Sequence, residues 1–457
     1  MKFVGTDLLV WSYEFSITVV CNDVISEEQL RKAASRMLEF WPTLSFRVNF
    51  TRSKAYETPA KSIDHGFLNL RSLDRFILPQ LAPRELAGVT VYDATILNKL
   101  FKKNARQSLK DRFCPRIFVI DAVSLRDATV MRFTLQHAAG EALSLHSAAT
   151  AFCECLFGNT GIRTATGARH YAAARDAETK DQQNVPTLSA VGGRIFQTSQ
   201  AAIWWEACTS SKLFPIRLLA NKWSNHWRYD SRWQMVHIPE KFLEQWRSTA
   251  NCAGAKVTLF DLFASWIQMK LSDYAHEIDP STKARLIITV SVRRSLQSPQ
   301  EREPELWNPV TLAMIKPATF DHLTQQQRLV QGAISIREHI QEVRDPAYIQ
   351  DYTALMSQAP RRQCQVKGVG GRTPVTMLLT SWSHAPFENL QVCTKPSDDS
   401  GPVLVQPQMN VIHSLPIPRG LDRQCAICWR GKAGGYWFTA NLEVPLWDRI
   451  LDFSSSS

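Results

Sequence analysis

The feature that most constrains the fold is a strand pattern that ends at His137 and runs directly into a helix pattern. Positions 131, 133 and 135 are apolar and share a face with His137, whereas positions 132, 134 and 136 are polar. Residues 138–140 are small, and apolar side chains then recur at helical spacing over 142–156. The histidine is therefore predicted to end a strand at a strand-to-helix turn.

The beginning of the chain shows the same alternation of strand and helix. Residues 1–20 are predicted to form a strand. Ser26 is placed to cap a helix, with Gln29 completing a capping box, and Pro42 ends that helix. Alternating side chains over 46–50 predict another strand.

The second half of the chain again alternates strands with helices, so we expect an α/β fold class. Pro239 is predicted to occupy a first helical position, and Thr258 with Asp261 is predicted to cap a further helix. The last two strands are expected to form a hairpin. The predicted strands of this half cover residues 233–238, 286–292, 377–382, 424–430 and 436–442.

The length of 457 residues predicts two domains, because it exceeds what one compact core usually holds. Residues 159–215 lose periodicity and gain polar residues, which favours a long loop or an interdomain crossover. We therefore expect an N-terminal domain over 1–158 and a C-terminal domain over 216–457, each with a mixed sheet and helices.

The charge of the chain suits a small anionic substrate better than nucleic acid. The formal net charge is +11, but the lysines and arginines are spread along the whole length. No zinc-finger spacing, basic-region helix or aromatic RNA-binding signature is present in the sequence. We expect small-molecule partners and no nucleic-acid partner.

The cysteines predict neither a disulfide scaffold nor a metal site. Ten cysteines in a chain of this length are too few for a disulfide-rich protein, so reduced thiols are expected. The pairs Cys153/Cys155 and Cys425/Cys428 lack further cysteines or histidines at zinc-ligand spacing. We expect no bound metal and no bound cofactor.

The apolar segments predict a protein outside the membrane. Residues 1–20 include Asp7 and Glu14 and do not resemble a secretory leader. No run approaches the roughly 20 apolar residues that a membrane span needs. We expect a soluble, cytoplasmic protein without membrane contact, and a monomer.

His137 is a candidate general base. Histidine can accept and return a proton near neutral pH, and the small residues after His137 would leave its ring uncovered. In acyl transfer it would take a proton from an attacking hydroxyl or amine. The local pattern alone is more often that of a buried structural histidine. The order of other segments along the chain must therefore distinguish a catalytic from a structural role for His137.

Several segments in order resemble the BAHD acyltransferases and their fungal relatives, a family marked by HxxxD in the first half and DFGWG in the second. The likeness covers nearly the whole chain, with His137 to Glu141 at the HxxxD position. The other matching segments are 30–47, Val290 to Arg294, Asn308 at a Gly-Asn turn, Thr380 to Phe387, and Lys395 with Pro396.

The resemblance implies two domains of the chloramphenicol-acetyltransferase type with a channel between them. His137 would face the channel as the general base. Thr380 and Trp382 would donate hydrogen bonds to the oxyanion, and Asn308 would lie near the substrate. Acyl-CoA would be a co-substrate that enters from one side, while the acceptor enters from the other.

The same resemblance assigns Glu141 a structural role, since the family residue at this position turns away from substrate and pairs with an arginine. Here the partner would be Arg293, or less favourably Arg294. The chain departs from the family in having Glu141 for aspartate and Ala142 for glycine. The DFGWG segment is also lost, with Gln391, Val392 and Cys393 at its first positions.

Three functions follow from these observations. The leading one is transfer of an acyl group, acetyl in particular, from acyl-CoA to a hydroxyl or amine of a specialised metabolite in a fungal pathway. The altered HxxxE loop leaves open a CoA-independent intramolecular cyclase or isomerase on the same fold. The third possible function is that of a binding or scaffold protein without catalytic activity. His146 is expected to be a packing residue, and His384 to lie in a surface loop rather than line the channel.

Overall fold

The computed structural model describes the chain in segments that together hold both predicted halves. The described residues are 13–21, 23–49, 54–56, 67–78, 84–86, 88–93, 95–101, 115–156, 231–280, 284–293, 310–315, 323–349, 352, 375–390, 404–411, 425–431 and 434–453. The whole of the predicted crossover 159–215 lies outside them, as do Asn308, Arg294 and Gln391 to Cys393.

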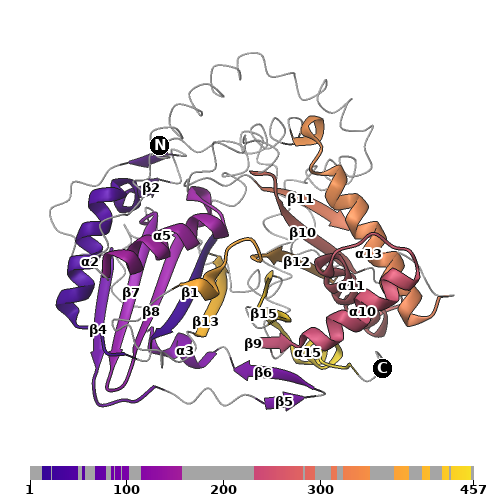
Figure 1. Ribbon diagram of the computed structural model, residues 1–457, viewed down its shortest axis with the longest axis horizontal. Helices are drawn as coiled ribbons and strands as arrows, with labels where there is room; N and C mark the ends of the chain where they lie inside the picture. Colours follow the sequence, from indigo (N-terminus) through magenta and orange to yellow (C-terminus); the bar gives the residue numbers. More distant parts are fainter. Residues whose placement is uncertain are drawn as a thin grey trace.

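A five-stranded mixed sheet with two covering helices forms one side of the molecule (Figure 1). Only its β4/β7 pair is parallel. The strand order is β13 (Leu404–Val411), β1 (Tyr13–Cys21), β8 (Thr129–Gln136), β7 (Phe118–Leu125) and β4 (Leu68–Leu73), and the helices are α2 (Glu27–Phe40) and α5 (Ala142–Leu156).

An eight-stranded mixed sheet forms the other side, with helices packed on the face away from the first sheet (Figure 1). Its strand order is β11 (Val310–Ile315), β10 (Arg285–Ser291), β12 (Thr376–Ser381), β14 (Cys425–Arg430), β15 (Tyr436–Glu443), β9 (Ser231–Ile238), β6 (Val89–Asp93) and β5 (Arg84–Leu86). The helices are α10 (Glu240–Cys252), α11 (Leu259–Ile278), α13 (Gln325–Glu342) and α15 (Val444–Ile450).

The remaining elements are β2 (Arg47–Asn49), β3 (Lys54–Tyr56), α3 (Thr95–Leu100), and the 3₁₀ turns η1 (Pro42–Ser45), η2 (His137–Ala139) and η6 (Phe387–Asn389). The α/β class with two mixed sheets is therefore confirmed.

The two sheets exchange strands across the boundaries expected from the sequence. β5 and β6, from the first half, extend the eight-stranded sheet beside β9. β13, from the second half, pairs with β1 along eight residue pairs and forms the edge of the first sheet beside β1 in Figure 1. The division into 1–158 and 216–457 therefore does not follow the sheets strictly, because neither exchange leaves a local signal in the sequence.

Helix starts were predictable where capping residues mark them. Ser26 and Gln29 form the predicted capping box of α2, and Thr258 and Asp261 form that of α11. Pro239 is the N-cap residue of α10 and not its first helical residue, so that prediction is wrong by one position.

Two large clusters of buried apolar side chains hold the layers together. One cluster joins α10, α11, α13 and α15 to the eight-stranded sheet. The other joins α2 and α5 to the five-stranded sheet and also takes in Trp382, Ile427 and Trp429 from the second half. Burial of this shared apolar surface fixes the two sheets against each other and stabilises the region between them.

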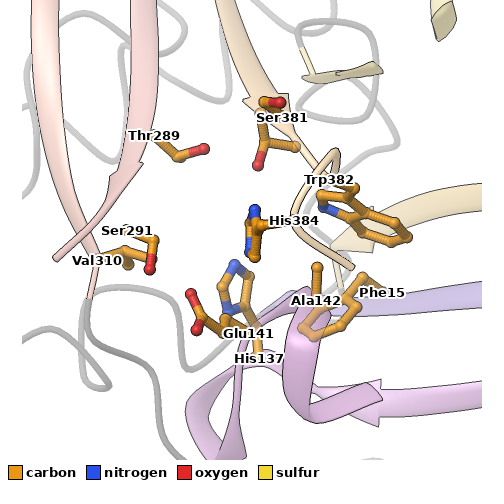
Figure 2. A pocket seen from close by; sticks show the side chains of 11 residues that line it. Phe15, His137, Glu141, Ala142, Thr289, Ser291, Val310, Ser381, Trp382 and His384 are labelled. Atoms are coloured by element: carbon orange, nitrogen blue, oxygen red, sulfur yellow. The ribbon is translucent and has the colours of Figure 1, made fainter. Parts of the chain in front are cut away.

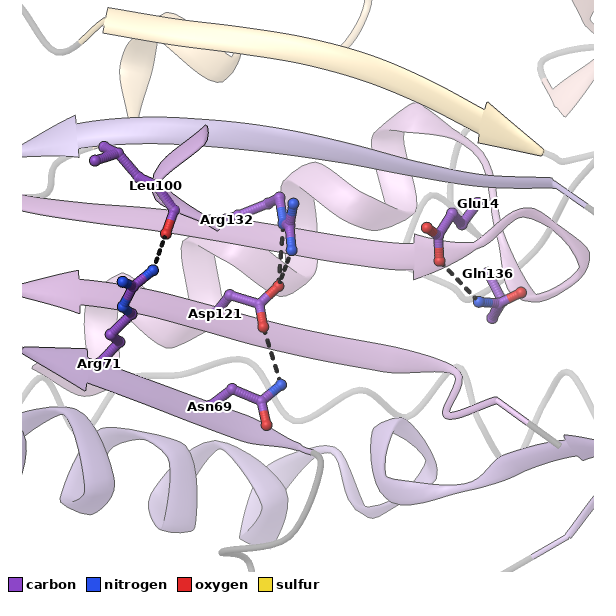
Figure 3. Close-up of polar contacts among 7 residues, drawn as sticks. All are labelled: Glu14, Asn69, Arg71, Leu100, Asp121, Arg132 and Gln136. Carbon is purple, nitrogen blue, oxygen red and sulfur yellow. Dashed lines mark hydrogen bonds and ion pairs between the residues drawn. The ribbon is translucent and has the colours of Figure 1, made fainter. Parts of the chain in front are cut away.

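The face of the five-stranded sheet opposite α2 and α5 carries a polar network (Figure 3). Arg132 on β8 donates from Nε and Nη2 to Oδ2 of Asp121 on β7, at 3.0 and 2.6 Å. Asn69 on β4 donates to the other carboxylate oxygen at 2.9 Å. The guanidinium also lies 4.5 Å above the ring of Phe101. These contacts satisfy the polar side chains that alternate with the buried ones.

Candidate active site

A pocket lies between the two sheets, with His137 on one side and the ends of β10 and β12 on the other (Figure 2). Its empty volume is about 400 Å³, including the part that opens to solvent. The lining residues are Phe15, His137, Glu141, Ala142, Thr289, Ser291, Val310, Thr380, Ser381, Trp382 and His384.

His137 begins the short turn η2 immediately after β8, one position later than the predicted strand end. Only 8% of the residue is exposed, and its ring meets the edge of Phe15 at a centroid distance of 4.9 Å. Nδ1 is fully covered and has no hydrogen-bond partner of good geometry within the described residues. Nε2 is therefore the ring nitrogen available to the pocket, and Figure 2 shows a ring nitrogen directed toward His384.

The surroundings keep the His137 ring neutral at neutral pH. Burial lowers its pKa from the ordinary 6.5 to about 4, because the charged imidazolium is poorly solvated there. Carbonyl groups of His137 and Gly140 and the charge of Glu141 favour the protonated ring but do not outweigh burial. A neutral imidazole can act as a base without first losing a proton to water.

This burial predicts the acid limb of any activity that needs neutral His137. With an ordinary pKa, about one tenth of the molecules would carry a neutral ring at pH 5.5. With the lowered pKa nearly all would, so kcat/KM should stay within about twofold between pH 7.0 and 5.5. A steady-state pH profile measures this. A tenfold fall by pH 5.5 in protein that remains folded would contradict the burial.

Glu141 and Arg293 form the ion pair that the family resemblance implies. Arg293 Nε donates to Oε1 of Glu141 at 2.7 Å, and both side chains are nearly covered. The pair joins the loop after His137 to the residue two positions beyond β10, so it also connects the two sheets. The guanidinium of Arg293 matches the charge of the buried Glu141 carboxylate.

Close packing at Gly140 shapes the same loop. A Cβ atom on Gly140 would lie 2.6 Å from Cβ of Ser144 in the first turn of α5, which is closer than carbon atoms approach. The absence of a side chain lets the chain turn sharply from η2 into α5. His137 and Glu141 are thereby brought to the same pocket.

The facing wall of the pocket is rich in hydroxyl groups. Thr289 on β10 and Thr380 on β12 are register partners on adjacent parallel strands, and Ser291 continues the same face of β10. The hydroxyls of Thr289, Ser291 and Thr380 have no side-chain hydrogen-bond partner in the described part of the chain. They can therefore serve a bound molecule as donors or acceptors.

Aromatic rings close the pocket beside these hydroxyls. Trp382 meets Phe15 at 5.6 Å and Phe387 at 5.4 Å between ring centroids. Its backbone N–H donates to the carbonyl of Cys428 at 2.8 Å, which ties the end of β12 to β14. Figure 2 shows the indole nitrogen on the side of Trp382 that faces His384.

Four of the six residues predicted for the site line the pocket, namely His137, Glu141, Thr380 and Trp382. Arg293 is not a lining residue but forms an ion pair with Glu141, which is one. Asn308 lies outside the described residues. Thr289 and Ser291 were missed, although two hydroxyl residues alternating with apolar ones in 286–292 are a usable signal.

The two additional histidines differ in their positions. His384, expected in a surface loop, is exposed and also lines the pocket. His146, expected to pack, is half-buried on α5 and donates from Nε2 to the carbonyl of Pro386 at 3.1 Å.

No group of potential metal ligands occurs within the described ranges, which include Cys153, Cys155, Cys425 and Cys428. Among the helices that the structure describes, none has the length and apolar character to cross a membrane.

Solved structures share this architecture at low sequence identity. F. sporotrichioides TRI101, complexed with coenzyme A and T-2, superposes with a TM-score of 0.63 at 11% identity, covering 99% of this chain and 96% of TRI101. Vinorine synthase gives 0.58 at 13% identity, covering 98% and 91%. Polyketide synthase associated protein 5 from Mycobacterium tuberculosis gives 0.57 at 10% identity, covering 100% and 98%.

Sequence comparison adds no relative, since no protein-family model and no curated protein matches the chain. The structural likeness runs over almost the full length of both chains. TRI101 and vinorine synthase are BAHD acyltransferases. The chain therefore has the two-domain fold of the BAHD acyltransferases.

Proposed function

We propose that this protein transfers an acyl group, acetyl in particular, from acyl-CoA to a hydroxyl or amine of a specialised metabolite. The observation that carries the proposal is the neutral, buried His137, which faces hydroxyl and indole groups of the other sheet across one pocket. TRI101 structures in complex with coenzyme A and T-2 or deoxynivalenol support both a CoA thioester and a small acceptor as ligands of this fold.

His137 acts as the general base in this proposal. Its Nε2 accepts the proton of the acceptor hydroxyl while the oxygen forms a bond to the thioester carbonyl carbon. The tetrahedral intermediate then breaks its carbon–sulfur bond, and the imidazolium returns the proton to the departing thiolate. Because the lowered pKa makes the imidazolium acidic, this return is favourable.

Thr380 and Trp382 are the proposed donors to the oxyanion. Both line the pocket, and the Thr380 hydroxyl has no other partner among the described residues. Donors positioned before the reaction stabilise the developing charge without reorganisation.

Replacing Thr380 by valine keeps the shape of the side chain and removes the donor. We expect kcat to fall about tenfold to a hundredfold, because Trp382 remains, with little change in KM for acetyl-CoA. Steady-state kinetics measures both constants. Thr249→Val, on α10 and outside the pocket, is the matched control. An unchanged kcat in Thr380→Val would remove Thr380 from this role.

The direct test follows free thiol release and product mass with acetyl-CoA and a panel of alcohols, phenols and amines that includes deoxynivalenol and T-2 toxin. We expect thiol release to increase with an acceptor and the product to gain one acetyl group. Absence of both with every member of a broad panel would argue against the proposal.

The motifs of this chain differ from those of the family, and this difference supports one alternative function. The alternative is a CoA-independent cyclase or isomerase. Glu141 replaces the family aspartate in the loop that follows His137. In this case His137 would move a proton within one biosynthetic intermediate. Conversion of an intermediate without an acyl donor, to a product of unchanged mass, would favour this alternative over acyl transfer.

A further inference from the structure

We propose that His384 is a second acceptor-contacting residue, which holds a neutral alcohol against His137 by donating a hydrogen bond to the reacting oxygen. The inference rests on the proposed acyl transfer and deepens it by naming the class of acceptor. His384 lines the same pocket as His137 but comes from the other sheet (Figure 2).

The first step concerns the position of the reacting oxygen. A general base must lie within hydrogen-bond distance of the proton that it removes. Since Nδ1 of His137 is covered, the acceptor hydroxyl must lie beside Nε2, on the side of the ring that faces His384. A hydroxyl that donates to Nε2 keeps two lone pairs for a second donor. An imidazole carries at least one N–H in either protonation state, so His384 can supply that donor.

The second step concerns how firmly His384 is positioned. It lies in the turn after β12, which the Ala385 N–H closes by donating to the carbonyl of Trp382 at 2.8 Å. Trp382 is itself bonded to β14 and packed between Phe15 and Phe387. His146 on α5 holds the far end of the turn through the carbonyl of Pro386. A turn fixed at both ends can present its side chain in a defined place.

The third step concerns charge. Among the described lining residues, Glu141 is the only carboxylate, Arg293 neutralises it, and no lysine or arginine is present. The described lining therefore offers no unpaired ionic group to a carboxylate or an ammonium group. Hydroxyl and imidazole groups on one side, and Phe15 with Trp382 on the other, match a neutral alcohol with one apolar face.

Benzyl alcohol is a suitable probe because it combines one neutral hydroxyl with one aromatic ring. In the presence of acetyl-CoA, His384→Ala should raise KM for benzyl alcohol about tenfold, the worth of one hydrogen bond. KM for acetyl-CoA should not change. His384→Gln supplies an amide N–H and should stay within about threefold of the wild type. Asn389→Ala, exposed in η6 and outside the pocket, is the control for the segment.

A binding measurement keeps this test independent of turnover. The ring proton resonance of His384, assigned by its loss in His384→Ala, should shift when benzyl alcohol is added to the wild type. An unshifted resonance, an unchanged KM for benzyl alcohol in His384→Ala, or a rise in KM for acetyl-CoA instead would overturn the role of His384. If the wild type releases no thiol from acetyl-CoA, the proposed transfer fails, and the resonance shift still decides whether His384 contacts an alcohol.

Discussion

Replacing His137 by glutamine should lower kcat/KM for acyl transfer by about 10²–10⁴ while leaving the fold intact, because glutamine fills much of the ring's space but cannot accept and return a proton. The loss should appear in kcat at every pH, with little change in KM for acetyl-CoA. Stopped assays of free thiol and acylated product measure it. The neutral state of the buried ring means that no ionic contact is lost with it.

The control for His137 is a histidine that lies far from the pocket. His276 is exposed in the last turn of α11, so His276→Gln should retain wild-type activity. Thermal unfolding of both variants checks the fold. Wild-type rates of product formation from His137→Gln would exclude His137 as the base, and a large loss of thermal stability would mean that the histidine serves packing instead.

Glu141→Ala should destabilise the protein by about 3–5 kcal/mol, because it leaves Arg293 buried without its counter-charge. The free energy of unfolding from urea titration measures this cost. Removal of both partners in Glu141→Ala with Arg293→Met should recover part of it, since the double variant leaves no unpaired charge. Activity should fall in the single variant because the His137 loop loses its anchor.

An exposed ion pair provides the matched comparison. Glu27 and Arg31 lie one turn apart on α2, with 64% and 42% of their side chains exposed. Glu27→Ala should therefore cost less than about 1 kcal/mol. Equal costs for Glu27→Ala and Glu141→Ala would show that the Glu141 pair contributes no more than a surface contact.

Local patterns predicted the elements that position the candidate base. Alternation over 131–137 is a property of neighbouring residues, and it gave β8 and the turn after it. The capping boxes at Ser26 and Thr258 are equally local. α13 has the same signal at Thr324 and Gln327, so its start could also have been predicted.

The remaining features depend on contacts between distant parts of the chain. β13 and β1 are paired over a separation of almost the whole sequence, and no short pattern encodes that pairing. His384 looked like a loop residue because its turn is exposed, and only the packing of Trp382 against Phe15 brings it to the pocket. The order of the motifs in the sequence suggested which residues meet at the site. The residues of the facing pocket wall could be identified only from the three-dimensional fold.

The strands exchanged between the two halves make the chain hard to divide into working pieces. A fragment that ends before β9 would leave β6 without β9 at its side, and would leave one edge of β1 open where β13 belongs. Open strand edges and uncovered apolar faces promote aggregation. Each half thus completes the sheet of the other, so shortened versions of this protein made for crystallisation or fusion should retain both halves in one polypeptide.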